Sequence, residues 1–193
     1  KTTDTDGTVL STPDLAAAPA GAAPVAAFDA RTIDAAGMRI GVSAEDLQAA
    51  ITRLYGKPDR TPRGPRSDYD PRFAGEIELD LMRCIYVQGR AYYDKDGIVR
   101  QVRIQRVLPR FDYEQARAAA IARFGPAAAL RGGNTPELSW GSKDPKLGPA
   151  LVLRIDPYGN TLSFGYSEVR AGSLDLTLTD VAWAAATAAL SAN

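Results

Sequence analysis

Three acidic side chains alternate along one short segment and are the groups in this chain best spaced for acid–base chemistry. Glu76, Glu78 and Asp80 share one face of the segment 76–81, whose other face is apolar. Paired carboxylates catalyse when their surroundings separate their pKa values. The same alternation is typical of a strand face turned to water, and we favour this alternative. Three arginines could oppose the acidic row from a neighbouring strand: Arg100, Arg103 and Arg106.

The chain has no histidine and a single cysteine, Cys84, which excludes several kinds of site. Serine–histidine and cysteine–histidine nucleophile pairs, histidine metal sites, an internal disulfide and paired-cysteine zinc or redox sites are all excluded. With 23 basic and 23 acidic residues, the net charge of zero offers no general attraction to nucleic acid or acidic membranes. We therefore expect no metal, no cofactor and no nucleic-acid partner, and an enzyme would depend on carboxylates alone.

An arginine-rich segment, residues 57–72, is a candidate for binding an anionic partner. Arg60, Arg63 and Arg66 recur at every third residue between prolines, which in an extended segment aligns them along one side. The planar guanidinium suits carboxylate or phosphate. The alternative is a solvated loop in which nearby aspartates partly cancel the charge. From this segment we take Arg63 and Arg66 as candidate partner-binding residues.

Aromatic residues are frequent on or beside the segments that we expect to form strands and turns. They are Tyr69, Tyr86, Tyr92, Tyr93, Trp140, Tyr158 and Phe164. Aromatic side chains and arginine are enriched in protein interfaces because they bury a large area at a small entropic cost. The alternative is that half of them belong to the core. We take Tyr69, Tyr92 and Trp140, together with Arg103, as further candidate partner-binding residues.

Two segments 69 residues apart share one helix pattern. Residues 43–58 read SAEDLQAAITRLYGKP and residues 112–127 read DYEQARAAAIARFGPA. Each begins with a good N-cap, Ser43 or Asp112, and ends in an aromatic residue, a glycine and a nearby proline. We predict two equivalent helices. The apolar stripe of the first one consists of Leu47, Ile51, Leu54 and Tyr55.

Strand and hairpin patterns follow each predicted helix. In the first unit, the alternating segment 76–81 predicts a strand, and Asp94–Gly97 predicts a hairpin turn. In the second unit, the corresponding segments are 137–141 for the strand and Asp156–Asn160 for the turn. Each unit is therefore expected to be one helix followed by three or four antiparallel strands.

These elements predict an α+β protein in which two tandem units form one antiparallel sheet with both helices on one face. We expect a flexible linker rich in alanine and proline at residues 1–27. The first unit spans 28–109 and the second 110–170, followed by a C-terminal extension at 171–193. A short helix from Asp180 to Leu190 would cover a sheet edge.

The alanine- and proline-rich stretch 15–27 bears on the cellular compartment. It is shorter than the roughly 20 apolar residues of a membrane span and is broken by Pro19, Gly21 and Pro24. It follows no basic segment, so it is not an intact signal peptide. Such stretches often tether mature exported proteins. We expect a periplasmic or secreted bacterial protein that is not integral to the membrane, with a cytoplasmic protein as the alternative.

The segment 36–45 reads AGMRIGVSAE, and the helix that it introduces ends in tyrosine-glycine-lysine-proline. This combination resembles the lead-in of a group of exported bacterial domains. The tandem version resembles the β-lactamase-inhibitor-protein-like (BLIP-like) fold, the single version resembles the SmpA/OmlA outer-membrane assembly lipoproteins, and the resemblance covers residues 28–169. It implies a periplasmic or secreted binding protein whose open sheet face grips a partner. Inhibitor proteins of this kind typically have disulfides, which this chain cannot form internally, so neither their target nor their contact residues are carried over.

Together, these observations predict a non-catalytic protein that binds another protein through an open sheet face, as an inhibitor or adaptor does. A small-ligand-binding or envelope-assembly domain is the alternative, and an enzyme using only carboxylates is third. An enzyme needs a deep pocket with perturbed carboxylates, whereas a binding protein needs a broad, shallow face with aromatic residues.

Overall fold

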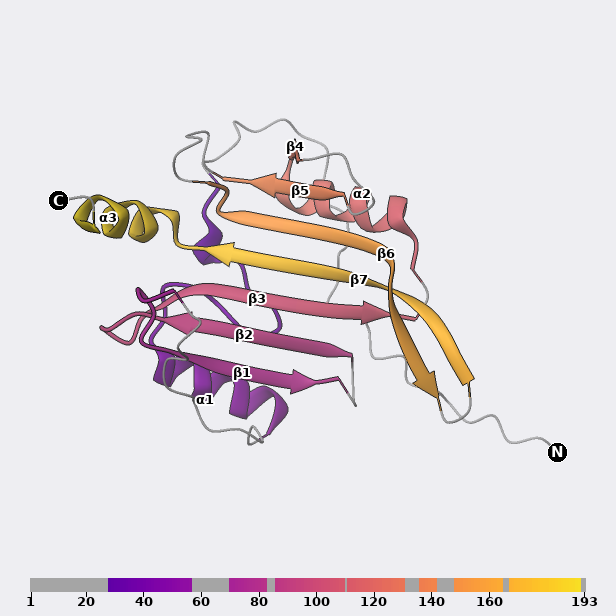
Figure 1. Ribbon diagram of the computed structural model, residues 1–193, viewed down its shortest axis with the longest axis horizontal. Helices are drawn as coiled ribbons and strands as arrows, with labels where there is room; N and C mark the ends of the chain where they lie inside the picture. The colour runs from indigo at the N-terminus through magenta and orange to yellow at the C-terminus, as the bar shows by residue number, and fades with distance from the viewer. Residues whose placement is uncertain are drawn as a thin grey trace.

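The computed structural model describes residues 28–56, 70–82, 86–109, 111–130, 136–141, 148–164 and 167–191. Within these ranges the chain forms a seven-stranded antiparallel sheet in the order β1-β2-β3-β7-β6-β5-β4, accompanied by three α-helices (Figure 1). The linker expected at residues 1–27 and the arginine-rich residues 57–69 lie outside the described residues.

Both predicted helices are present and start and stop as the sequence indicates. Helix α1 is Ala44–Tyr55 and α2 is Tyr113–Phe124. Ser43 Oγ accepts a hydrogen bond from the Asp46 N–H, and Asp112 Oδ1 accepts one from the Gln115 N–H, each at 3.0 Å. Glycines 56 and 125 end the helices with positive φ angles of 85° and 82°, which residues with a Cβ rarely adopt.

The two helices differ in how much they bury. In α1, Leu47 and Ile51 are buried, whereas Leu54 and Tyr55, expected to continue the same stripe, are exposed. In α2, Ala120 is the buried residue, and it occupies the position equivalent to Ile51. The second helix therefore contributes less apolar surface to the core, as its alanine-rich sequence suggests.

The first unit consists of α1 and three strands joined in sequence: β1 (Gly75–Leu81), β2 (Val87–Tyr93) and β3 (Val99–Leu108). The turn predicted at Asp94–Gly97 joins β2 to β3. Asp94 Oδ1 accepts hydrogen bonds from the Asp96 and Ile98 N–H groups, and Gly97 has a φ of 74°. A hairpin turn therefore accounts for the aspartates of this segment.

The second unit consists of α2 and four strands, and one of its predicted turns is wrong. The strands are β4 (Ala128–Leu130), β5 (Glu137–Trp140), β6 (Leu151–Phe164) and β7 (Ser167–Thr179). Residues 156–160, predicted as a hairpin turn, lie inside β6. The pairing shifts register there, from Asp156 opposite Ser173 to Asn160 opposite Ala171. The ladder accommodates Pro157 and Gly159 as a bulge, so turn-forming residues do not reverse the chain here.

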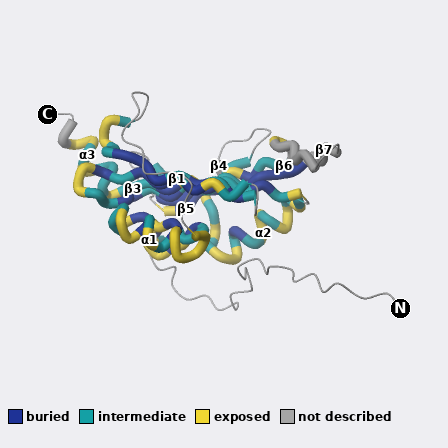
Figure 2. The backbone as a smooth tube through the Cα atoms, turned by 90° about the horizontal axis from the view of Figure 1, so that it is seen from below, coloured by how far each residue is buried: buried dark blue, intermediate teal, exposed yellow. Residues whose placement is uncertain are grey.

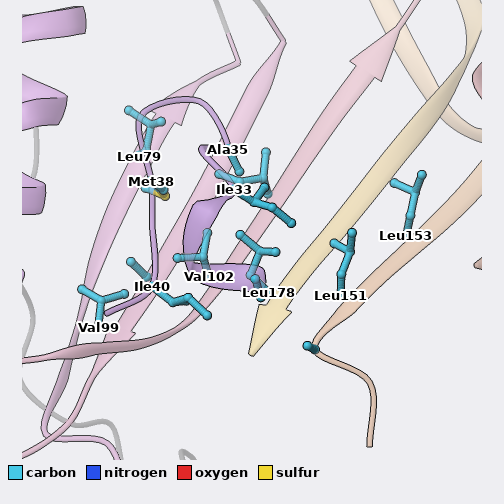
Figure 3. Close-up of a cluster of buried hydrophobic side chains, with 14 of the residues drawn as sticks. Ile33, Ala35, Met38, Ile40, Leu79, Val99, Val102, Leu151, Leu153 and Leu178 are labelled. Carbon is cyan, nitrogen blue, oxygen red and sulfur yellow. The ribbon is translucent and has the colours of Figure 1, made fainter. Parts of the chain in front are cut away.

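One antiparallel seam joins the two units. Residues 101–108 of β3 pair with residues 179–172 of β7, so the last strand of each unit lies at the centre of the sheet. The boundary expected at residue 170 falls inside β7. Figure 3 shows buried side chains of both units in one cluster, including Val102 of β3, Leu178 of β7 and Leu151 of β6. The two units therefore share one sheet and one core.

The sheet and helices form two layers. Figure 2 shows α1 and α2 on the same side of the sheet. This confirms the predicted α+β architecture, with two helix-plus-strand units in one sheet and their helices on one face.

The lead-in segment before α1 also belongs to this layer. Ala35 and Met38 pair across a tight turn with Ala36 and Gly37 at positive φ. Met38 is fully buried, and a Cβ at Gly89 of β2 would lie 3.0 Å from the Met38 sulfur. The missing side chain at Gly89 thus lets the methionine approach the sheet closely.

Helix α3 (Val181–Ser191) follows β7 directly, close to the predicted bounds of Asp180 to Leu190. It lies beyond the end of β7 (Figure 1). The edge strands are β1 and β4, and α3 contacts the chain just before β1, where Trp183 stacks on Phe73.

Candidate functional site

The sheet face turned away from α1 and α2, hereafter the open face, extends across the strands of the sheet. Strand alternation places every second residue on it, since the intervening residues form the core. The register then sets the order across the sheet. One row runs Glu78–Arg90–Arg103–Thr177–Val152–Ser139, and the next runs Asp80–Gln88–Gln105–Asp175–Arg154–Glu137. The face is therefore polar, with charges of both signs.

Among the described residues, two ion pairs join charges on neighbouring strands of the open face. Arg90 of β2 lies 3.7 Å from Glu78 of β1, and Arg154 of β6 lies 3.2 Å from Glu137 of β5. Within the acidic row of β1, Arg90 opposes Glu78, whereas Glu76 is buried and Asp80 Oδ1 accepts a hydrogen bond from the Met82 N–H at 3.1 Å. The pairing of Glu78 with Arg90 is ordinary cross-strand chemistry.

Arg103 lies near the middle of the open face and differs from these arginines. Its side chain is exposed, and within the described ranges it makes no ion pair. Its Nε donates to Gln101 Oε1 at 3.1 Å, and its guanidinium carbon lies 5.5 Å from the centre of the Tyr92 ring. Its register partner on the neighbouring strand β2 is another arginine, Arg90. The side chain is therefore held by two neighbours while its Nη groups remain available.

A line of three aromatic rings, hereafter the aromatic line, runs from Arg103 to the C-terminal helix. Phe73, which precedes β1, has its ring centre 5.4 Å from that of Tyr92 and 5.4 Å from that of Trp183 in α3. The Phe73 and Trp183 rings are stacked at 26°. Arg72 and Arg100 place their guanidinium carbons 5.5 and 5.7 Å from the indole ring. Such arginine–indole contacts are cation–π interactions.

Beneath the aromatic line, an ion-pair cluster joins the β2–β3 turn to the start of α3. Arg100 donates from Nε to Asp94 Oδ2 at 2.7 Å and from Nη1 to Asp180 Oδ2 at 2.8 Å. Arg31 adds a contact of 3.2 Å to Asp180. Both carboxylates are about 3% exposed.

The arginines decide the ionisation of both carboxyl groups. Burial alone would raise the pKa of Asp94, but hydrogen bonds from Arg100 and from backbone N–H groups lower it below its ordinary value. Burial likewise opposes ionisation of Asp180, but the Trp183 N–H, Arg100 and Arg31 together lower its pKa. Both groups are therefore charged near neutrality. The cluster is suited to holding the β2–β3 turn and α3 together, and its carboxylates are not suited to donating protons.

The structure separates the candidate residues chosen from the sequence. Arg103 and Tyr92 lie together on the open face, although Tyr92 is only 5% exposed, beside Phe73. Trp140 is misplaced by the sequence analysis. It is 5% exposed in the core on the helix side, and its Nε1 donates to Gly125 O at 2.8 Å. Tyr69, Arg63 and Arg66 lie outside the described residues.

Sequence reasoning missed Phe73, and it considered Arg100 only as a partner for the acidic row of β1. Both lie next to expected strands, and no local pattern distinguishes them from other surface residues. Trp183 lies in the segment that was expected to form the C-terminal helix. Only the fold brings these segments, more than 100 residues apart, into contact.

Two other kinds of site were searched for in the described part of the chain. It contains no group of three or more histidine, cysteine, aspartate or glutamate residues that could hold a metal ion. No helix there is both long and apolar enough to cross a membrane. Comparison of the chain with protein-family models, with curated proteins and with solved structures finds no significant match to any of them.

Proposed function

We propose that this chain is a non-catalytic bacterial envelope protein that binds another protein through the open face, as an inhibitor or adaptor does. The observation that carries the proposal is Arg103, an exposed arginine held in place by Tyr92 and Gln101 and without a carboxylate partner among the described residues. Interface hot spots are enriched in arginine and aromatic side chains, and prior ordering of the arginine reduces the entropic cost of binding.

The extent of the open face supports the same proposal. Seven strands spaced about 4.8 Å apart span roughly 29 Å, and a seven-residue strand is roughly 23 Å long. The product is on the order of 650 Å², close to the roughly 800 Å² that each partner contributes to a standard protein interface. The mixed charges along its rows also suit a selective contact, since complementary charges favour one partner over others.

The location in the periplasm or outside the cell is part of the proposal. It is supported by the alanine- and proline-rich stretch 15–27 and by the resemblance of residues 28–169 to exported bacterial binding domains. The same resemblance supports an inhibitor-like role. The arrangement of two helix-plus-strand units in one sheet is a further point in its favour.

Affinity capture from an envelope extract of the source organism tests the proposal. The unaltered protein, Arg103→Glu and a matched control, Arg53→Glu, are used as baits. Arg53 is an exposed arginine on α1, on the opposite side of the sheet. We expect one protein to be retained by the unaltered chain and by Arg53→Glu. Arg103→Glu should lose roughly 30-fold in affinity, which corresponds to a hot-spot contribution of about 2 kcal/mol.

Two results would count against the proposal. Equal retention by Arg103→Glu would show that the contact lies elsewhere on the molecule. A small molecule that copurifies with the chain, with no protein retained, would favour a ligand-binding domain instead.

A further inference from the structure

Helix α3 is fastened to the sheet mainly through its first turn. Asp180, just before the helix, is held by Arg100 and Arg31, and its Oδ1 accepts a hydrogen bond from the Trp183 N–H at 3.2 Å. The Trp183 ring stacks on Phe73. Of the residues 181–189, none is buried. The first turn therefore carries the contacts that position the rest of the helix.

The remainder of α3 gains little from packing. It is an 11-residue helix made largely of alanine, and it contains no charged side chain. Helices of this length are marginal in water without tertiary contacts. Segments with few buried contacts open at a lower free-energy cost than the sheet to which they are attached. Separation of α3 from Phe73 requires Trp183, in the first turn, to leave the Phe73 ring and the Asp180 carboxylate, and no residue of 181–189 is buried to oppose it further.

The groups around the Trp183 ring are held in place without it. Arg72 donates to Asp70 at 2.9 Å, Arg100 donates to Asp94, and Tyr92 belongs to β2 at the interior of the sheet. If Trp183 moves away, a Phe73 ring face flanked by two guanidinium groups is left. A ring face with adjacent cations accepts an aromatic side chain, and indole gives the strongest cation–π contact.

We infer that Phe73, with Arg72 and Arg100, forms a binding site for an aromatic side chain of a protein partner, and that Trp183 fills this site in the unbound chain. The inference rests on the proposed function and extends it, because the aromatic line places this site next to Arg103. The partner would present an aromatic residue beside a carboxylate. Helix α3 then acts as a detachable lid, because Trp183 and the aromatic side chain of the partner compete for the same site.

A small aromatic probe tests the site directly. The full-length Trp183→Ala variant, which vacates the site, is titrated with N-acetyl-L-tryptophanamide while backbone amide NMR signals are recorded. The signals of Phe73, Arg72 and Tyr92 are expected to shift saturably. The unaltered protein, whose site is filled, should bind the probe at least tenfold more weakly.

A second substitution serves as the control. Phe73→Leu added to Trp183→Ala keeps an apolar side chain but removes the ring, and the shifts should disappear. Unchanged signals from β5 and β6 show that each variant is folded. The inference is overturned if Trp183→Ala binds the probe no better than the unaltered protein, or if Phe73→Leu leaves binding intact.

Hydrogen exchange in the unaltered protein tests the lid without any substitution. The amides of residues 185–190 should exchange at least 100-fold faster than those of residues 174–178 in β7. Equal protection would mean that α3 opens only with the whole fold, and the lid would be excluded. The experiments test the aromatic-binding site and the proposed function independently of each other. Probe binding that persists while Arg103→Glu still captures the partner would retain the site and reject the open-face contact.

Discussion

At the scale of single residues, Arg100 connects the β2–β3 turn to the C-terminal helix. It ties Asp94 in the β2–β3 turn to Asp180 at the start of α3, and its guanidinium lies over Trp183. It is an ion-pair partner of both buried carboxylates. Asp94 also accepts hydrogen bonds from two backbone N–H groups. Asp180 also contacts Arg31 and the Trp183 N–H. An arginine between two buried acids is costly to remove because both charges are then left poorly paired.

Replacement of Arg100 by methionine is therefore expected to lower the free energy of unfolding by about 3 kcal/mol at pH 7. The control is Arg39→Met, which removes an exposed ion pair of 2.8 Å with Asp34 and should cost less than about 1 kcal/mol. Urea unfolding of the two variants and the unaltered chain provides the measurement. Similar losses in both variants would contradict the importance assigned to Arg100.

The same variant should show a specific pH dependence. The folded-state pKa values of Asp94 and Asp180 are lowered. Their stabilising contribution is thus fully present above the unfolded aspartate value of about 3.9 and is lost as the pH falls through the lowered values. Without Arg100, protonation of these acids relieves an unpaired charge. The stability difference between the unaltered chain and Arg100→Met should therefore shrink between pH 5 and about pH 3, and a constant difference would refute the argument.

Residue types alone indicated part of the candidate site. Arg103 and Tyr92 were chosen because arginine and tyrosine are common in interfaces, and both lie on the open face, but Trp140 satisfied the same criterion and lies in the core. Composition cannot distinguish the two sheet faces where a strand is as short as β5. Phe73 and Arg100 gain their roles from contacts with α3, and no local pattern contains that information.

At the scale of elements, the two equivalent helices are unequal parts of the core. Ile51 of α1 is 1% exposed, and Ala120 of α2 is the corresponding small residue. Ile51→Ala should cost about 2–5 kcal/mol by leaving a cavity. Ala120→Ile should cost about 1–3 kcal/mol by overpacking, because Ala120 is buried and the larger side chain must enter the core. Thermal and urea unfolding test both, and a stabilising Ala120→Ile would show that α2 covers a void.

Helix ends were predicted well because capping is local, as Ser43, Asp112, Gly56 and Gly125 illustrate. Strands were harder. Leu174, Leu176 and Leu178 alternate with polar residues in the strand β7, yet residues 171–193 were assigned to a C-terminal extension. Residues 156–160 show the opposite error, because pairing with β7 over its full length outweighs a local turn preference.

At the scale of the whole molecule, the β3–β7 seam makes the two units one folding unit. Its pairs span the centre of the sheet, and Met38 of the lead-in segment belongs to the same buried cluster as Leu151 of the second unit. Neither unit buries its apolar face fully without the other. The fold is therefore expected to be cooperative despite its repeated sequence.

Native-state hydrogen exchange can measure this cooperativity. The most protected amides of β2 in the first unit and of residues 151–155 of β6 in the second should exchange through one global opening with the same free energy. Their values should also fall together as urea is added. Two distinct free energies would show that the units open separately, and the shared core would then be of minor energetic importance.

The seam also bears on how such a chain could arise. An antiparallel contact between corresponding last strands is self-complementary, which is the geometry of a two-fold symmetric dimer. A gene for one unit could encode such a dimer, and duplication with fusion would then hold the halves together permanently. Each half is released from the need to suit a copy of itself. The two halves can then diverge. They differ in having Ala120 in α2 where α1 has Ile51, and in the long β6–β7 ribbon of the second unit.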